Sequence, residues 1–113
     1  MSSKPIVFLK NTRHLIKDFP EEARRDAGAQ IRHLQEGSLP DDWKPMPSIG
    51  SGAMEIRIHK PHQHRVIYVA KHQEAVYIIH AFDKKTEKTS LHDIQVAKNA
   101  YSYMLKIRQE QQL

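Results

Sequence analysis

The sequence predicts a single α+β domain over residues 1–113, with a core from about residue 6 to 107. Two observations lead to this fold class. Apolar and polar residues alternate over 54–59, and two further β-branched runs follow after short connections, which is typical of neighbouring strands. Apolar residues at helical spacing come before and after these strands, as in domains whose helices pack on a small sheet.

The first third of the chain is predicted to form one strand and two helices. Residues 6–9 are apolar and rich in strand-forming residues. A helix is expected from about residue 12, and a second one from Pro20, because proline is accepted in the first turn of a helix. An apolar stripe and a glycine stop define this second helix: Ala23, Ala27, Ile31, Leu34 and Gly37. The two helices therefore form a hairpin.

Residues 38–52 are predicted to form a long irregular connection, because three prolines and two glycines interrupt any regular pattern. Trp43 lies in this connection, where covering the edge of the core is the more ordinary role and stacking on a base the alternative.

Strands are expected at 54–59, 65–70 and 75–82, as an antiparallel meander, because the connections are too short for parallel crossovers. Ser90 is a good N-cap for a last helix. We expect all helices on one face of the sheet.

Composition excludes several classes of protein. The chain has no cysteine, so disulfide frameworks, thiolate metal sites and cysteine nucleophiles are excluded. The apolar run at 75–79 is far shorter than the about 18 residues that cross a membrane. The first residues lack the apolar stretch of a secretory signal. We therefore expect a cytoplasmic protein with no membrane partner.

Charge is the strongest guide to a binding partner. The chain carries 18 Lys and Arg against 13 Asp and Glu, which gives a net charge of +5. Between residues 56 and 73 there are basic residues and histidines but no acid. This distribution favours a polyanion such as nucleic acid, or an acidic protein.

Several motifs in this order resemble the HigB-like, phage-derived branch of the RelE/ParE toxin superfamily. The similarity covers about residues 6–107, and the stretch from His80 to Thr86 is its most specific part. The motifs are Phe19-Pro20-Glu21-Glu22-Ala23, Glu55-Ile56-Arg57-Ile58, Arg65-Val66-Ile67-Tyr68 and His80-Ala81-Phe82 followed by Lys84-Lys85-Thr86. The resemblance implies a RelE/ParE-like fold with a small antiparallel sheet, an N-terminal helical hairpin and a C-terminal helix.

The resemblance also implies a function and partners. Members of this superfamily are small basic toxins of type II toxin–antitoxin systems. RelE-type members cleave mRNA on the ribosome, whereas ParE-type members poison DNA gyrase on the same fold. The implied partners are a cognate helix-turn-helix antitoxin, the ribosome and mRNA, with operator DNA reached only through the antitoxin. Because fold does not decide between these activities, the site residues must.

RNA cleavage by side chains alone needs a group that helps to deprotonate the 2′-hydroxyl, cations that stabilise the phosphorane, and an acid for the 5′-oxygen. The predicted catalytic residues are Arg57, Arg65, His80, Lys84 and Lys85. The arginines and lysines are expected to clamp phosphate, and His80 to act as general acid or base. The same pattern also fits a hydrogen-bonded core histidine and ordinary ion pairs of the arginines with Glu55 or Asp83.

Further residues are expected to contact RNA without taking part in the chemistry: Lys60, His62, His64, Lys71 and Lys88. A solvated loop is the alternative for the lysines. The turn histidines 59, 62 and 64 have a spacing that could suit zinc, but no fourth ligand is evident, so we expect neither a metal nor another cofactor. Tyr68 is expected to pack in the sheet rather than to stack on a base.

Three functions remain open from the sequence. The favoured one is a toxin that cleaves mRNA on the ribosome. The second is a gyrase inhibitor that acts by protein contact, for which the basic sheet residues would be dispensable. The third is a nucleic-acid-binding domain without catalysis, whose affinity would fall steeply with salt.

Overall fold

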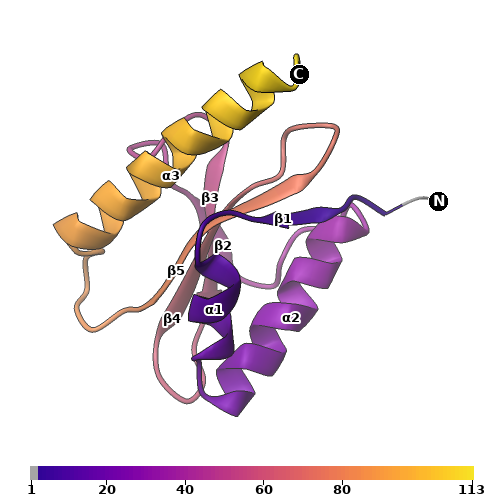
Figure 1. Cartoon of the computed structure of the whole chain (residues 1–113). Coiled ribbons are helices and arrows are strands. Elements are labelled where there is room, and N and C mark those ends of the chain that lie inside the picture. The colour runs from indigo at the N-terminus through magenta and orange to yellow at the C-terminus, as the bar shows by residue number, and fades with distance from the viewer. Residues whose placement is uncertain (1–2) are drawn as a thin grey trace.

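A five-stranded mixed sheet forms the centre of the molecule; the structure, a computed structural model, describes residues 3–113. In the order β1-β5-β4-β3-β2, the strands are β1 (Ile6–Phe8), β5 (Val76–Asp83), β4 (His64–Val69), β3 (Ala53–Ile58) and β2 (Trp43–Pro45). The helices are α1 (Thr12–Lys17), α2 (Glu21–Gln35) and α3 (Leu91–Glu110). The predicted α+β class is confirmed (Figure 1).

The three central strands form the predicted antiparallel meander, but the two edge strands differ from the prediction. At one edge β1 runs parallel to β5, with Ile6 opposite Val76, so the sheet is mixed rather than antiparallel. At the other edge, residues 43–45 form a strand within the connection that was expected to be irregular. Pro45 argues against a central strand, yet an edge strand tolerates proline because one side of it needs no hydrogen bonds.

The expectation that all helices lie on one face is wrong, because helices cover both faces (Figure 1). On one face, Phe19, Ala27 and Ile31 of the helical hairpin pack with Ile56 and Val66. On the opposite face α3 packs through Ala97, Ala100, Tyr101 and Met104. The reason is that every residue of β4 is buried, and a strand that is apolar on both sides needs cover on both.

The local signals for helix boundaries are confirmed. The apolar stripe of α2 is buried, and Gly37 follows the helix with a φ of +83°, the left-handed conformation that ends helices. Ser90 Oγ accepts a hydrogen bond from the Asp93 backbone N–H at 3.0 Å, which caps α3. No helix among residues 3–113 is long and apolar enough to cross a membrane.

Candidate active site

Two arginines lie directly opposite each other on β3 and β4. Arg57 is the cross-strand partner of Arg65, and both occupy the face that α3 covers elsewhere. Like charges placed directly opposite each other destabilise a sheet. Their presence is therefore unfavourable for the fold alone and marks this end of the sheet as a candidate site.

A buried carboxylate lies between these arginines. Glu55 is 0% exposed, and its Oε1 lies 3.5 Å from Arg65 Nε and 3.9 Å from Arg57 Nε. Among the described residues, 3–113, neither carboxylate oxygen accepts a hydrogen bond. Glu55 thus offsets the charge of both guanidinium groups but leaves them incompletely paired.

Arg65 is held in one orientation. Its Nη1 donates to the His64 carbonyl oxygen at 2.9 Å, and its Nη2 donates to Gln63 Oε1 at 3.1 Å. Burial lowers the pKa of Arg65, and the neighbouring Glu55 opposes this shift. Arg57 is more open, with a side chain 35% exposed. The pair therefore combines a fixed guanidinium with one that a ligand can reach.

Two lysines complete a cluster of four cations. The Lys84 backbone N–H donates to the Gln63 carbonyl oxygen at 2.8 Å, which brings this residue back beside Arg65. Burial lowers the pKa of the Lys84 ammonium, and Arg65 lowers it further. Lys44 on β2 is the cross-strand partner of Glu55 and also contributes to this lowering. We refer to Arg57, Arg65, Lys84 and Lys44 as the cation cluster.

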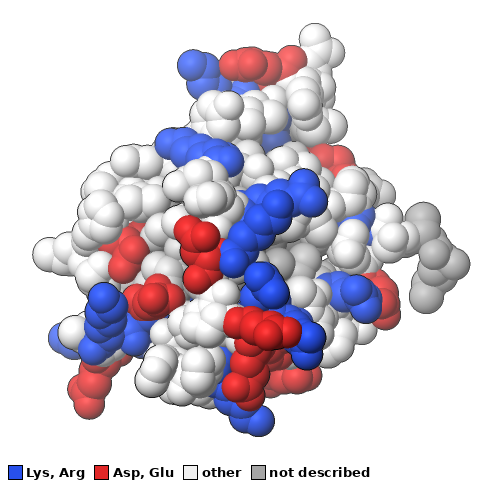
Figure 2. All heavy atoms as spheres, turned by 60° about the horizontal axis from the view of Figure 1, so that its bottom comes forward, with Lys and Arg blue, Asp and Glu red and all other residues white. Residues whose placement is uncertain are grey.

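The cation cluster is not part of a uniform basic surface. Figure 2 shows blue Lys and Arg side chains interspersed with red Asp and Glu over the face of the molecule that is drawn. Within the cluster itself, Asp42 Oδ1 lies 3.9 Å from Arg57 Nη1. The site thus gathers cations locally, within a face that carries charges of both signs.

His80 is less accessible than the predicted catalytic role assumed. It is 6% exposed, stacks on Phe82, and its Nε2 lies 2.9 Å from Asp93 Oδ1. Burial lowers the pKa of His80, although Asp93 opposes the shift. His80 therefore connects β5 to the capped start of α3, and it lies below the surface that a substrate could reach.

The predicted RNA-contacting residues fall into two groups. Three of them, Lys60, His62 and Lys88, are exposed at the same end of the sheet as the cation cluster, in the β3–β4 turn or after β5. The predicted catalytic Lys85 is exposed there as well. His64 is 2% exposed, and it packs against Phe19 on the opposite face while its Nδ1 lies 2.7 Å from Asp83. Contact between His64 and RNA is therefore incompatible with this structure.

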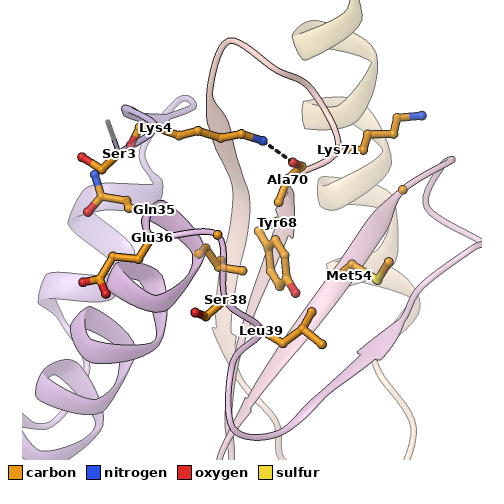
Figure 3. A pocket seen from close by; sticks show the side chains of 13 residues that line it. Ser3, Lys4, Gln35, Glu36, Ser38, Leu39, Met54, Tyr68, Ala70 and Lys71 are labelled. Carbon is orange, nitrogen blue, oxygen red and sulfur yellow. Dashed lines mark hydrogen bonds between the residues drawn. The ribbon is translucent and has the colours of Figure 1, made fainter. Parts of the chain in front are cut away.

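Lys71 lies at the other end of the sheet, beside a separate groove (Figure 3). Its Nζ donates to Ser51 Oγ at 2.9 Å. The groove has a volume of about 810 Å³ and is lined largely by apolar groups of α2, β3 and β4, among them Leu34, Met54 and Tyr68. Tyr68 is buried as expected for sheet packing. This groove and the cation cluster are thus different places on opposite faces of the sheet.

The turn histidines do not form a metal site. Among residues 3–113, no three His, Asp or Glu side chains come together as metal ligands. His64 points to the hairpin face, whereas His59 lies 2.6 Å from Asp42 and 3.0 Å from Gln63. His59, Lys44 and Glu55 were not predicted as site residues, because their neighbours come from β2 or from across a hairpin.

Comparison with known proteins agrees with the fold. The family model described as "Phage derived protein Gp49-like (DUF891)" matches residues 14–102, which is most of the chain. No curated protein matches the chain. The matched range includes most of α1, all of α2, the strands β2 to β5 and the first part of α3. The chain therefore belongs to the Gp49-like family of phage-derived proteins, which is part of the RelE/ParE-like toxin family.

Proposed function

We propose that this protein is the toxin of a type II toxin–antitoxin pair, of the HigB-like branch, and that it cleaves mRNA on the ribosome. The family is associated with toxins of such pairs. The observation that carries the endonuclease proposal is the cation cluster. Arg57 and Arg65 face each other at a cost to the sheet, above a buried carboxylate and beside Lys84. Binding of a phosphate would relieve this repulsion.

In this proposal Arg57, which is 35% exposed, contacts the scissile phosphate, and Arg65, which is 4% exposed, adds its positive charge from beneath the surface. A guanidinium offers parallel N–H donors that match two phosphate oxygens, and charge-assisted bonds of this type are strong. Arg65 is held by Gln63 and by the His64 carbonyl oxygen, so its charge is fixed in place before the substrate binds. Negative charge grows on the phosphorane oxygens, and fixed cations stabilise it more than they stabilise the ground state.

Lys84 is the proposed general base. Its lowered pKa increases the fraction of neutral amine, the form that can accept the proton of the 2′-hydroxyl. The 2′-oxygen then attacks phosphorus while the bond from phosphorus to the 5′-oxygen breaks. The products are a 2′,3′-cyclic phosphate and a 5′-hydroxyl. Lys85 is exposed next to Lys84 and is assigned to charge stabilisation.

The ribosome would supply orientation. Exposed Lys60, His62 and Lys88 surround this end of the sheet and can bind RNA phosphates. Bringing message and toxin together in one geometry lowers the barrier by removing an entropic cost, so free RNA should be cut poorly. An antitoxin partner would have to cover the cation cluster or deform it, and operator DNA would be bound through that partner.

Cell-free translation with the purified protein, followed by primer extension on the message, tests the proposal. Cleavage should require translating ribosomes and should disappear in the Arg65→Gln, Lys84→Gln double variant. Lys17→Gln with Arg24→Gln removes the same charge from exposed sites on α1 and α2 and should leave cleavage intact. An intact message would reject the nuclease, and inhibition of gyrase would then support the ParE-like alternative.

A further inference from the structure

A half-exposed histidine lies at the edge of the cation cluster. His59 follows Arg57 by two residues, and its side chain is 51% exposed. Its Nε2 lies 2.6 Å from Asp42 Oδ2, and its Nδ1 lies 3.0 Å from Gln63 Oε1. Gln63 belongs to the same turn, but Asp42 lies 17 residues earlier in the chain, so the orientation of the imidazole is fixed by tertiary structure and not by the turn alone.

Both ring nitrogens of His59 face hydrogen-bond acceptors. An ionised carboxylate can only accept a hydrogen bond, so the Nε2–H of His59 donates to Asp42. Gln63 Oε1 is identified as the acceptor because Arg65 Nη2 donates to the same oxygen at 3.1 Å. The doubly protonated ring, which is the form that a general acid needs, therefore has a partner for each of its N–H groups.

The same contacts connect His59 to both arginines. Asp42 Oδ1 lies 3.9 Å from Arg57 Nη1, and the Asp42 carbonyl oxygen accepts the Arg57 backbone N–H at 2.8 Å. On the other side, Gln63 connects His59 to Arg65. A closed chain of contacts thus runs from one arginine to the other through Asp42, His59 and Gln63, and it fixes the imidazole relative to the phosphate clamp.

We propose that His59 is the general acid of the cleavage reaction and that Asp42 is its positioning residue. This inference rests on the proposed function. The bound RNA displaces Gln63 Oε1 from Nδ1, and the Nδ1 proton passes to the 5′-oxygen as the bond from that oxygen to phosphorus breaks. The Nε2 proton stays on the imidazole and continues to donate to Asp42 Oδ2. The 2′-hydroxyl proton goes to Lys84. The RNA therefore loses one proton to Lys84 and gains one from His59.

The other histidines near this end fit the acid role less well. His80 and His64 are 6% and 2% exposed, and each is engaged with a carboxylate away from the cluster. His62 is exposed in the turn, and no side-chain contact with it is found among residues 3–113. His59 alone combines exposure, an orienting carboxylate and a link to both arginines in the described part of the chain.

A message with sulfur in place of the 5′-bridging oxygen at the mapped cleavage position tests the acid role directly. A thiolate leaves without being protonated, so loss of a general acid should matter only for the oxygen message. On that message, His59→Gln should reduce the cleavage rate by about 100-fold or more, the usual contribution of general acid catalysis. On the sulfur message, His59→Gln should cleave at nearly the wild-type rate, and Asp42→Asn should show the same pattern with a smaller loss.

His14→Gln is the matched control, because it removes a histidine of α1 that also pairs with a carboxylate, Asp18, but is 75% exposed and lies outside the cation cluster, so it should keep wild-type rates on both messages. Equal losses on both messages in His59→Gln, or no loss on either, would overturn the acid role while leaving the nuclease in place. If the wild-type protein cuts neither message, the proposed function fails and the acid role fails with it. NMR gives a readout without RNA: Asp42→Asn should remove a slowly exchanging Nε2 proton of His59, and its persistence would contradict the positioning role of Asp42.

Discussion

The α3-covered face of the sheet has two ends that are built in opposite ways from the same strands. At one end, Ala53 of β3 and Val69 of β4 pack under Tyr101 and Met104 of α3. The Tyr101 hydroxyl is satisfied there, since it donates to the Ser51 carbonyl at 2.6 Å. At the other end, Glu55 and Arg57 lie two and four residues after Ala53 on β3, and Arg65 lies four residues before Val69 on β4, in place of apolar side chains.

The charged end retains polar atoms that the apolar end would not tolerate. Within residues 3–113, both oxygens of Glu55 and the Nε atoms of Arg57 and Arg65 are buried without a hydrogen bond. Each such group costs about 1–3 kcal/mol of stability. A buried ion pair is often less stable than apolar residues of similar size. The apolar end therefore stabilises the fold, whereas the charged end costs stability, a cost that the proposed phosphate-binding role would explain.

The largest predicted effect is on the free energy of unfolding. It compares an ion pair that loses one partner with an ion pair that loses both. Glu55→Leu leaves Arg65 buried without its counter-charge and should lower the free energy of unfolding by about 3–5 kcal/mol. The double variant Glu55→Leu, Arg65→Met removes both charges and should recover that loss, or exceed the wild type by about 1–4 kcal/mol. Urea unfolding measures both.

The same double variant should lose RNA cleavage although it is stable, because Arg65 is part of the clamp. A double variant that is less stable than Glu55→Leu alone would contradict the view that this end sacrifices stability. Retained cleavage in the double variant would instead place the site elsewhere.

The next effect probes the apolar end. A Cβ at Gly50 would lie 2.5 Å from Cζ of the Tyr101 ring, so Gly50→Ala must displace the residue that anchors α3. We expect a loss of about 1–3 kcal/mol, as for other overpacked cores, measured by thermal unfolding. Gly28→Ala is the control: nothing lies within 4 Å of the added carbon in mid-α2, and a gain of about 0.5–1 kcal/mol is expected there. Equal melting temperatures for Gly50→Ala and wild type would disprove this close packing.

A smaller effect concerns pH at the apolar end. The Arg108 guanidinium lowers the pKa of Glu74 to about 2, and the Tyr77 hydroxyl also donates to this carboxylate. Since the folded pKa lies below the ordinary value of 4.5, this pair stabilises the fold fully above about pH 4.5 and loses its contribution as pH falls towards 2. Glu74→Gln should therefore be less stable than wild type at pH 7 and nearly equal to it near pH 2. A constant difference between pH 7 and pH 2 would contradict the ion-pair account.

How much of these two ends could be predicted from the sequence depends on how far apart along the chain the contacting residues lie. The stripe of α2, the three central strands and the Ser90 cap rest on neighbours within a few residues, and they were predicted correctly. The second covered face was missed, although the unbroken apolar run from Val66 to Val69 has no polar side for solvent. The alternation of polar and apolar residues in β3 indicates a strand with only one buried side, whereas β4 has no such alternation from Val66 to Val69.

The candidate site was predicted in part for the same reason. Arg57, Arg65 and Lys84 follow from charge grouped on strands expected to be neighbours. Lys44 and Asp42 come from a connection expected to be irregular, and their place depends on β2 pairing with β3. The partners of His59 lie 17 residues before it and across a turn, so periodicity offers no signal for them. Burial of His80 and His64 depends on α3 and on Phe19, which only the packed structure supplies.

The smallest predicted effect concerns the salt dependence of RNA binding by the exposed lysines beside the charged end. Lys85 and Lys88 are exposed after β5 and would contact phosphates without ordering the site. Each phosphate contact on single-stranded RNA contributes about 0.7 to the slope of log affinity against log salt concentration. Lys85→Gln with Lys88→Gln should therefore reduce that slope by about 1.4 in RNA-binding titrations. The loss in affinity should be similar for different RNA sequences, because phosphate contacts carry no sequence information. Lys17→Gln on α1 should leave the slope unchanged, and an equal reduction by that variant would mean that RNA binds to the net charge of the molecule rather than to its charged end.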